Sequence, residues 1–285
     1  MGRRGRTTAI RQLIRDRLKP GGLVYVSYNC LPGWTSEVPL QKLIVELAEG
    51  LNGDSLQRTE QAIFALQRLS DSGLQYFRDH PSAATALEAY RCSERSYLAH
   101  EFLNNAWKPR YSIDVAVEMA EAEVSYVGSA TLVDNHAELI IDATVAKAIA
   151  ALDTTRQKQL ATDFAVNRQF RRDVFVRARC DASLISVAEV GAAEIDVAES
   201  LSRQTIGCPG APDTINTTVQ VPRGSISFHA DFICELRALM TLGPTALGEL
   251  VTTLSAASRS EKEIARNLLY LIAAGTLTPS AKPLR

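Results

Sequence analysis

Residues 18–27 read LKPGGLVYVS, and this stretch decides the fold class because two periodicities meet in it. Upstream, apolar residues such as Ile10 and Leu13 recur at helical spacing and predict an amphipathic helix over 8–18. The Pro-Gly-Gly turn ends that helix. The run after the turn is rich in β-branched and aromatic residues and predicts a buried parallel strand over 23–27. A helix, a turn and a strand in this order are typical of an α/β sheet.

The Gly21-Gly22 doublet has the wrong neighbours for a cofactor loop. In doubly wound folds the glycine-rich loop that approaches a nucleotide follows a strand and opens a helix. Here a helix precedes the doublet and a strand follows it. The sequence therefore predicts a turn at this point, and it predicts no cofactor-binding residue and no bound cofactor in this chain.

Composition and charge are those of an ordinary soluble globular protein. The 285 residues are 46% hydrophobic and 22% charged, and the length allows two domains. The 31 Lys and Arg balance 32 Asp and Glu, so the net charge of -1 gives no general attraction to nucleic acid or to an anionic membrane. No apolar run approaches the roughly 20 residues of a membrane span. The five cysteines lack metal-ligand spacing, which predicts a cytoplasmic protein without a metal site.

The pattern between residues 37 and 123 is almost wholly helical, with turn signals at 52–55 and 79–82. At 124–133 the period changes towards β, and 170–179 again has the pattern of a strand. This change predicts an α+β chain that is mainly helical. Further predicted elements are a helix over 112–120 with Ser112 as its cap, a helix over 154–168, and short strands over 194–199 and 217–221.

The last segment predicts a small winged-helix-like domain with three helices and a β tail. Ser260 and Glu263 have the spacing of a capping box, and Gly275 stands where a left-handed glycine ends a helix. The predicted elements are helices over 232–242, 245–254 and 260–274, the last with Ile264, Leu268, Leu271 and Ile272 as its buried stripe, and a strand over 276–278.

Four phrases in one order carry a resemblance to a known family. They are YVSYN with LPGW in 25–34, YLAHEFLN in 97–104, VGSA in 127–130 and NRQFRRDVF in 167–175. Together they resemble bacterial class I methyltransferases that use S-adenosylmethionine (AdoMet) and carry a methyltransferase regulatory domain. Bacterial protein-lysine methyltransferases acting on outer-membrane proteins are similar to this family.

The resemblance implies an N-terminally truncated chain in three parts. Residues 1–35 would be the end of a Rossmann-like methyltransferase fold, 36–226 the regulatory domain and 227–285 the winged-helix-like domain. In the complete enzyme the resemblance implies AdoMet as cofactor, a protein substrate as partner and a lysine as methyl acceptor. For this chain it implies a regulatory or substrate-recognition role. Catalytic residues stay unassigned, the truncated chain is expected to be inactive by itself, and a homodimer is left open.

Tyr28 and Asn29 stand at the carboxyl end of the predicted strand, the edge where open α/β sheets place their ligands. Asn29 is a candidate to orient a nucleophilic amine, and Trp34 is a candidate to line the pocket. Tyr28, Asn29 and Trp34 are therefore the candidate substrate-binding residues. The alternative is that 29–33 form only a turn with an anchoring tryptophan, and the sequence leaves both interpretations open.

The pair His100-Glu101 begins like a zinc-protease helix motif. Asn104, however, occupies the position of the second histidine, so the motif lacks its second nitrogen ligand. The pair is better explained by a helix surface or by a polar contact to the loop after Trp107.

Two segments raise the alternative of a DNA-binding regulator. The arginine-rich run 168–179 contains two phenylalanines, but alternation on a strand explains its arginines as residues that solvate an edge or pair with acids. Residues 228–285 contain six Lys and Arg and five Asp and Glu, so their net positive charge is too small to attract DNA strongly. Glu261 and Glu263 would also face phosphate at the start of the third helix. Binding of DNA through 228–285 is thus the runner-up function.

Overall fold

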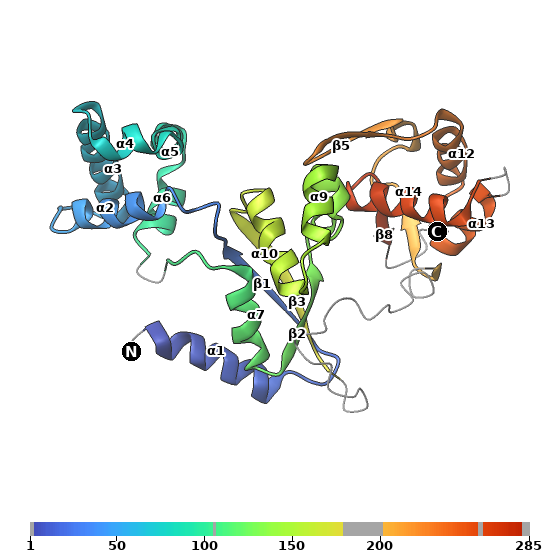
Figure 1. Ribbon diagram of the computed structural model, residues 1–285, viewed down its shortest axis with the longest axis horizontal. Coiled ribbons are helices and arrows are strands. Elements are labelled where there is room, and N and C mark those ends of the chain that lie inside the picture. The colour runs from blue at the N-terminus through green and yellow to red at the C-terminus, as the bar shows by residue number, and fades with distance from the viewer. Residues whose placement is uncertain (1–2, 105–106, 179–201, 256–258, 281–285) are drawn as a thin grey trace. The chain divides into compact units, whose positions relative to one another are not determined.

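The structure is a computed structural model that describes residues 3–104, 107–178, 202–255 and 259–280. Helices and strands occur in both of its compact units, and helix predominates (Figure 1). The expectation of a mainly helical α+β chain is confirmed at that level. No helix in the described ranges is long and apolar enough to cross a membrane. The first unit comprises 1–19, 26–123 and 167–171, and the second comprises 20–25, 124–166 and 172–285.

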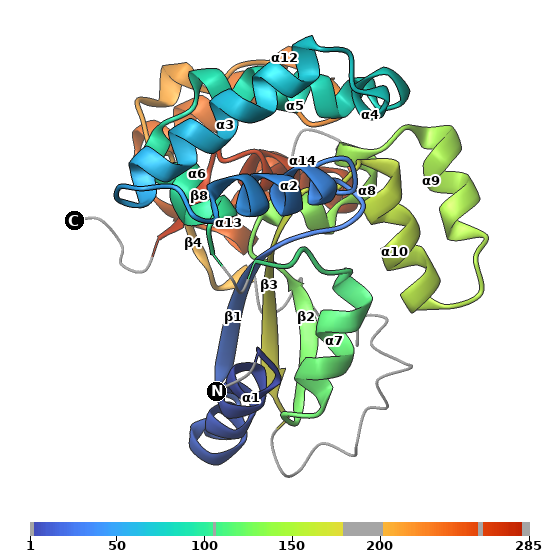
Figure 2. The ribbon, with the colours of Figure 1, turned by 90° about the vertical axis from the view of Figure 1, so that its left-hand side faces the viewer.

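The helix and strand that open the chain form where the LKPGG turn predicts them. Helix α1 spans Arg3–Arg17 and strand β1 spans Leu23–Asn29, and Gly21 between them has a left-handed φ of 77°. β1 is the edge of a three-stranded sheet in the order β1-β3-β2 (Figure 2). In this sheet β2 spans Val124–Ser129 and pairs antiparallel with β3, which spans Phe170–Arg177.

The direction of β1 differs from the prediction of a parallel strand. At its start the Arg177 amide donates to the Gly22 carbonyl at 3.0 Å, and just past its end the Cys30 amide donates to the Gln169 carbonyl at 2.7 Å. The residue numbers rise along β1 while those of the paired residues on β3 fall, so β1 and β3 are antiparallel. A run of apolar residues indicates a strand but not the direction of its neighbour.

One face of β1 is also open, which differs from the prediction of burial. The side chains of Leu23 and Tyr25 are 66% and 57% exposed. They alternate along the strand and so share one face. β1 has one strand neighbour in the described sheet, and nothing in its own sequence decides whether a second layer covers the other face.

Five helices of the first unit follow the turn signals of the sequence. Asp54 caps α3 by accepting the Gln57 amide at 2.9 Å, and the Gln57 side chain accepts the Asp54 amide at 3.0 Å, which makes a capping box. A break that the pattern does not predict follows Asp71, where Gly73 has a φ of 87°. The helices are α2 (Val38–Ala48), α3 (Ser55–Asp71), α4 (Gln75–Asp79), α5 (Pro81–Cys92) and α6 (Arg95–Phe102).

The core of the first unit joins these helices to the segment before them. Leu40, Ile44 and Leu66 are fully buried at the packing of α2 on α3. Phe102 of α6 and Trp34, which precedes α2, belong to the same core. Close packing of this kind restrains side-chain positions, so residues around Trp34 are held in place by the helices.

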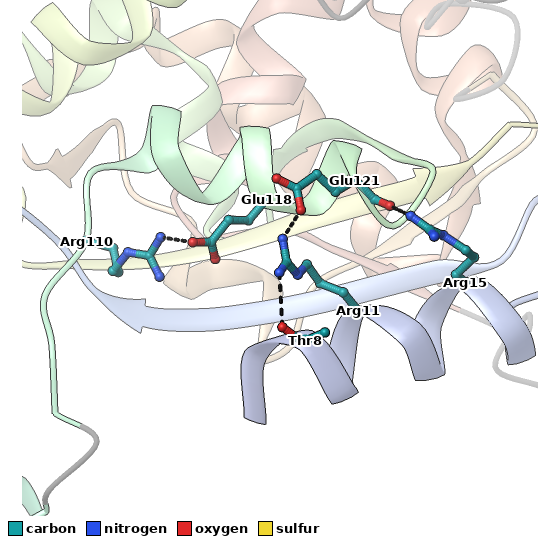
Figure 3. Close-up of polar contacts among 6 residues, drawn as sticks. All are labelled: Thr8, Arg11, Arg15, Arg110, Glu118 and Glu121. Atoms are coloured by element: carbon teal, nitrogen blue, oxygen red, sulfur yellow. Dashed lines mark hydrogen bonds and ion pairs between the residues drawn. The ribbon is translucent and has the colours of Figure 1, made fainter. Parts of the chain in front are cut away.

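Helix α7 (Ser112–Ala120) is tied to α1 by charged groups, as Figure 3 shows. The Arg11 guanidinium forms an ion pair with the Glu121 carboxylate, and the Arg15 guanidinium donates to the Glu121 carbonyl. Carbonyls at a helix end lack an intrahelical partner, and Arg15 supplies one at the end of α7.

Two predicted caps do not form. Ser112 is the first helical residue of α7, and Tyr111 takes the N-cap position instead. Ser260 does occupy the N-cap of α14, but its side chain makes no capping hydrogen bond, so the box with Glu263 is not made. Sequence spacing marks where a cap can form, whereas the local backbone and the side-chain rotamer decide whether it does.

Strand β3 is the central strand of its sheet, so its arginines do not solvate a sheet edge as the alternation predicted. Arg171, Asp173 and Phe175 alternate on one face and are all buried. A buried guanidinium on a central strand is not presented to the phosphates of a nucleic acid. Arg171 is therefore part of the fold, whereas Arg172 on the same strand is exposed.

The segment between β2 and β3 has less strand and more helix than predicted. Asn135 accounts for the early end of β2, because its side chain accepts the Ser129 amide and donates to the Ser129 carbonyl, both at 2.8 Å. Thr154 and Gln157 form a capping box at the start of α10, within the predicted helix 154–168. The elements are a 3-10 helix, η1 (Leu132–Asn135), and the helices α8 (Ala137–Ile140), α9 (Ala143–Ala150) and α10 (Thr155–Ala165).

The described residues after 228 form three helices, as predicted. Residues 245–246 form a short strand that pairs with β4, so the second helix begins later than predicted, at Leu247. Gly275 has a left-handed φ of 75°, and the final strand begins at Thr278, two residues later than predicted. The stripe Ile264, Leu268, Leu271 and Ile272 is buried as predicted. The winged-helix assignment stays a prediction, and the predicted strand 194–199 lies outside the described residues.

The strands of this part form two small sheets. One has the order β7-β4-β8, and the other is the hairpin β5-β6, which includes the predicted strand at 217–221. The elements are β4 (Thr205–Gly207), η2 (Pro212–Thr214), β5 (Thr218–Val221), β6 (Gly224–Ser227), α12 (Ala230–Thr241), β7 (Thr245–Ala246), α13 (Leu247–Ser255), α14 (Glu261–Ala273) and β8 (Thr278–Ser280).

Candidate functional site

The carboxyl end of β1 is held by backbone hydrogen bonds on two sides. The Arg110 amide donates to the Asn29 carbonyl at 2.9 Å, and the Leu31 amide donates to the Arg110 carbonyl at 3.0 Å. On the other side the Cys30 amide donates to the Gln169 carbonyl at 2.7 Å. These bonds fix the backbone from which the Asn29 side chain projects.

The Asn29 side chain is hydrogen-bonded to Glu101 of α6. Its amide nitrogen donates to Glu101 Oε1, and the indole nitrogen of Trp107 donates to the same oxygen. The sequence-based explanation was a polar contact of the His100-Glu101 pair to the loop after Trp107, and the observed contact of Glu101 is with the Trp107 side chain itself. The link to Asn29 spans 72 positions of the chain and is not visible in the sequence.

Both tryptophans of the chain lie beside this contact. The ring centroids of Trp34 and Trp107 are 5.4 Å apart with an interplanar angle of 82°, an edge-to-face arrangement. Trp34 is 8% exposed, and its indole nitrogen donates to the Gln169 carbonyl at 2.9 Å. Trp34 is thus a buried anchor, and it also packs against the ring that binds Glu101.

A second carboxylate, Glu37, belongs to the same region and was not singled out by any motif. It stands at the N-cap of α2, three residues after Trp34, and is 8% exposed. The buried Tyr90 of α5 donates its hydroxyl to Glu37 Oε2 across 53 positions of the chain. A glutamate after a turn is ordinarily solvated, so no sequence signal marks this one as buried.

Burial is the largest influence on the pKa of Glu37 and raises it above 4.5. The hydrogen bond from Tyr90 opposes the rise, and the nearby carboxylate of Glu101 adds to it. Burial also raises the pKa of Tyr97, with further contributions from Glu101 and Glu37. Glu37 and Glu101 are therefore close enough to influence each other electrostatically. We call the set the Glu37–Glu101 cluster: Asn29, Trp34, Glu37, Tyr90, Tyr97, Glu101 and Trp107.

The three candidate substrate-binding residues of the sequence are only partly brought together. Asn29 and Trp34 belong to the Glu37–Glu101 cluster through Glu101 and Trp107. Tyr28 is half-buried beside Asn29 on β1 and is not part of the cluster. A substrate-binding role for Tyr28, Asn29 and Trp34 stays a prediction.

The Gly21-Gly22 turn does not fit a cofactor cradle. The Gly21 amide donates to the Arg177 carbonyl at 2.8 Å, and the Gly22 carbonyl accepts the Arg177 amide. A loop that holds a nucleotide needs free backbone N–H groups aimed at the ligand. The Gly21 amide already donates to the Arg177 carbonyl, so we derive no cofactor chemistry from these glycines. Within the described ranges, no three side chains of the metal-binding types come together.

The bases of the last segment are partly used inside it. Arg237 donates to the Ile215 carbonyl at 2.9 Å, and Arg259 forms an ion pair with Glu235 at 2.7 Å. Bases engaged in this way contribute less to a surface that neutralises phosphates. No observation in this segment favours DNA binding, which stays a prediction.

One family model matches this chain. Residues 94–177 match the model described as a predicted methyltransferase regulatory domain. This range begins at α6 and ends with β3, so it contains Glu101 and Trp107 of the Glu37–Glu101 cluster. The prediction of a methyltransferase-related chain with a regulatory domain is confirmed.

Two curated proteins show similarity over different lengths. A protein of Synechocystis sp. that has no assigned function is 29% identical over 242 residues, which are 85% of this chain and 46% of that protein. A protein of Rickettsia prowazekii, also without an assigned function, is 28% identical over 97 residues, which are 33% of this chain and 38% of that protein. The chain thus spans less than half the length of the curated relatives it matches.

Two solved structures of PKMT2 from Rickettsia typhi have a similar fold. The TM-scores are 0.60 for one structure and 0.63 for the other, which is in complex with AdoHcy. Each match covers 99% of this chain and 56% of the solved chain at 17% identity. At this identity the likeness concerns the fold.

The raised pKa of Glu37 predicts a pH-dependent effect of Glu37→Gln on stability. A carboxyl group whose pKa is raised by folding stabilises the fold while it is protonated, and this contribution is lost as pH rises through the folded pKa. At about pH 7, well above the pKa of an unfolded glutamate, this contribution is diminished and Glu37 costs stability, while glutamine can still accept the Tyr90 hydrogen bond. We expect Glu37→Gln to raise the urea midpoint at about pH 7 and to change it little at about pH 4.

The control for this measurement is Glu46→Gln on the same helix. Glu46 is half-exposed and pairs with Lys42, so its replacement should change the midpoint by a similar small amount at both pH values. Equal effects of Glu37→Gln at both pH values would show that the Glu37 carboxylate does not carry a buried charge.

Proposed function

We propose that this chain, whose residues 94–177 match the model of a predicted methyltransferase regulatory domain, is the regulatory and substrate-recognition portion of an AdoMet-dependent methyltransferase. The methyl acceptor we propose is the side chain of a protein lysine. AdoMet, bound outside this chain, supplies the methyl group. The residues of this chain recognise and position the acceptor.

The observation that carries this proposal is the contact between Asn29 and Glu101. Asn29 ends the strand that resembles the fifth strand of the methyltransferase fold, and Glu101 lies in the regulatory domain. Ligands of open α/β sheets bind beyond the carboxyl ends of the strands. A regulatory domain that contributes a carboxylate at this position is suited to select what enters there.

The open face of β1 supports a neighbouring catalytic domain. Leu23 and Tyr25 share one face of β1 and are each more than half exposed. Large apolar side chains that are exposed together favour coverage by another protein surface. The relatives are more than twice as long as the part that matches, which leaves room for an AdoMet-binding sheet. We propose that such a sheet covers this face.

The remaining parts of the proposal follow the resemblance. Residues 1–35, 36–226 and 227–285 are proposed as the end of the catalytic fold, the regulatory domain and the winged-helix-like domain. A cytoplasmic location and a protein substrate are proposed on the same basis. The similar fold of PKMT2 supports this organisation without identifying the acceptor.

A reconstitution experiment tests the proposal. The chain is fused to the part of the Synechocystis relative that it does not match, which is more than half of that protein. We expect transfer of labelled methyl groups from AdoMet to a lysine-containing bacterial protein extract with the fusion, and no transfer with either half alone. Acid hydrolysis of the product should release methylated lysine.

Two results would count against the proposal. One is a fusion that binds AdoMet but transfers no methyl group to any protein. The other is salt-dependent binding of duplex DNA by the isolated chain, which would favour the runner-up function through residues 228–285.

A further inference from the structure

The bonds at the carboxyl end of β1 show which backbone groups of this strand point to which side. On one side the Cys30 amide donates to the carbonyl of Gln169, the residue just before β3. On the other side the Asn29 carbonyl accepts the Arg110 amide, and the Leu31 amide donates to the Arg110 carbonyl. Because the N–H and C=O groups of successive strand residues point to alternate sides, even-numbered residues of β1 face β3 and odd-numbered residues face the other edge.

The odd-numbered residues Leu23, Tyr25 and Ser27 therefore direct their N–H and C=O groups away from β3. β1 is the terminal strand of its sheet in the part of the chain that the structure describes. All three residues are exposed. A row of unpaired backbone groups along an apolar strand is a template for pairing with another strand.

The contact of Arg110 shows which direction of neighbour this edge accepts. Cys30 and Arg110 form an isolated bridge of the parallel type at the carboxyl end of β1. Helix α7 begins at Ser112, so the bridge is not extended into a strand. Parallel pairing is thus already present at one end of an edge that is open over 23–27.

The composition of β1 is also that of a strand with a neighbour on each side. The run over 23–26 is apolar at every position, which is typical of parallel strands that are buried on both faces. In this chain β1 has an antiparallel neighbour and an open face. A parallel strand on the open edge, with the layer of its own domain over Leu23 and Tyr25, satisfies both features of the run.

We propose that the open edge of β1 pairs with a parallel β-strand from the part of the longer relatives that this chain does not match. This rests on the proposed function and adds the element through which the catalytic part joins this chain. More than half of the Synechocystis relative lies outside the match. The backbone groups of Leu23, Tyr25 and Ser27 bond to the incoming strand, which continues the sheet on the side of β1 opposite to β3.

Residue-resolved amide hydrogen exchange tests the pairing. In the chain by itself, the amides of Val24 and Val26 should exchange slowly because they face β3, and those of Tyr25 and Ser27 should exchange fast. Fusion to the unmatched part of the Synechocystis relative should slow the exchange of the Tyr25 and Ser27 amides about 100-fold. The same part is also supplied as a separate chain, for the case that the fusion does not fold. If neither arrangement slows these two amides, the proposal is wrong.

Proline variants test the same bonds through stability. Tyr25→Pro removes an N–H that faces the open edge, whereas Tyr25→Ala removes the same ring and keeps the N–H. In the chain by itself the two variants should have similar urea midpoints. In the fusion Tyr25→Pro should lower the midpoint more than Tyr25→Ala, since only the proline loses a bond to the added strand. Equal midpoints of the two variants in the folded fusion would overturn the proposal.

Val26→Pro is the matched control for the proline itself. The Val26 amide faces β3, so this variant should lower the urea midpoint both in the chain by itself and in the fusion. If Val26→Pro is tolerated in the chain by itself while Tyr25→Pro is not, the two edges of β1 are assigned the wrong way round and the proposal fails.

A second copy of this chain is the alternative occupant of the edge. Slow exchange of the Tyr25 and Ser27 amides in the chain by itself, together with a dimer mass in sedimentation, would identify that occupant and overturn the proposal. None of these measurements involves AdoMet. Slowed amides without methyl transfer therefore contradict only the proposed function, and methyl transfer with fast-exchanging amides contradicts only the strand pairing.

Discussion

In the fused, active protein, Asn29→Ala is expected to lower kcat/KM for methyl transfer about 100-fold while changing the urea midpoint little. Asn29 donates to Glu101, and alanine leaves that carboxylate with Trp107 as its remaining donor. A reacting group that is misplaced by a small distance can lose on the order of 100-fold in rate. Steady-state kinetics and urea unfolding on the same preparations measure both quantities.

Asn52→Ala is the matched control for this prediction. Asn52 lies in the exposed turn before α3, away from the cluster, so its replacement should change neither activity nor stability much. A positioning role for Asn29 predicts that both kcat and KM change. Full activity of Asn29→Ala would favour the alternative in which 29–33 form only a turn anchored by Trp34.

The largest expected effect on stability comes from Leu268→Ala in α14. Leu268 is fully buried in the core of the last three helices. Truncating a buried leucine removes apolar contacts and leaves a cavity, which typically costs about 2 to 5 kcal/mol. We expect the free energy of unfolding of this part, measured by urea titration, to fall by that amount. Methyl transfer by the folded fraction should be unchanged.

Leu242→Ala is the control of the same chemistry. Leu242 follows α12 and is 85% exposed, so its replacement should change the free energy of unfolding by no more than about 0.5 kcal/mol. Similar losses for both variants would mean that the stripe of α14 is not the core of this segment. A large loss of activity in folded Leu268→Ala would connect the last segment to the reaction.

The Glu37–Glu101 cluster gives the regulatory domain a specific place in the proposed enzyme. Glu101 and Trp107 come from residues 94–177, whereas Asn29 and Glu37 come from the chain before it. The site is therefore assembled from residues inside and outside the range that the family model matches. Recognition of the acceptor would then depend on the regulatory domain being in place.

The sequence alone was sufficient to predict the local elements with strong periodicity. The helix and strand around LKPGG, the helix after Thr154 and the buried stripe with Leu268 were all predicted from spacing. The position of Asn29 at a strand end was also predicted. These features depend on residues that are close in the sequence, where periodicity and turn chemistry act directly.

Tertiary structure alone decided the direction and exposure of β1 and the composition of the site. Glu37 meets Tyr90 across 53 positions and Asn29 meets Glu101 across 72 positions. A carboxylate acquires a raised pKa only when packing removes water from it and places another charge nearby. The sequence determined which residues could form a strand end and a helix face, and the packing of α5 and α6 against the segment after β1 determined which of them meet.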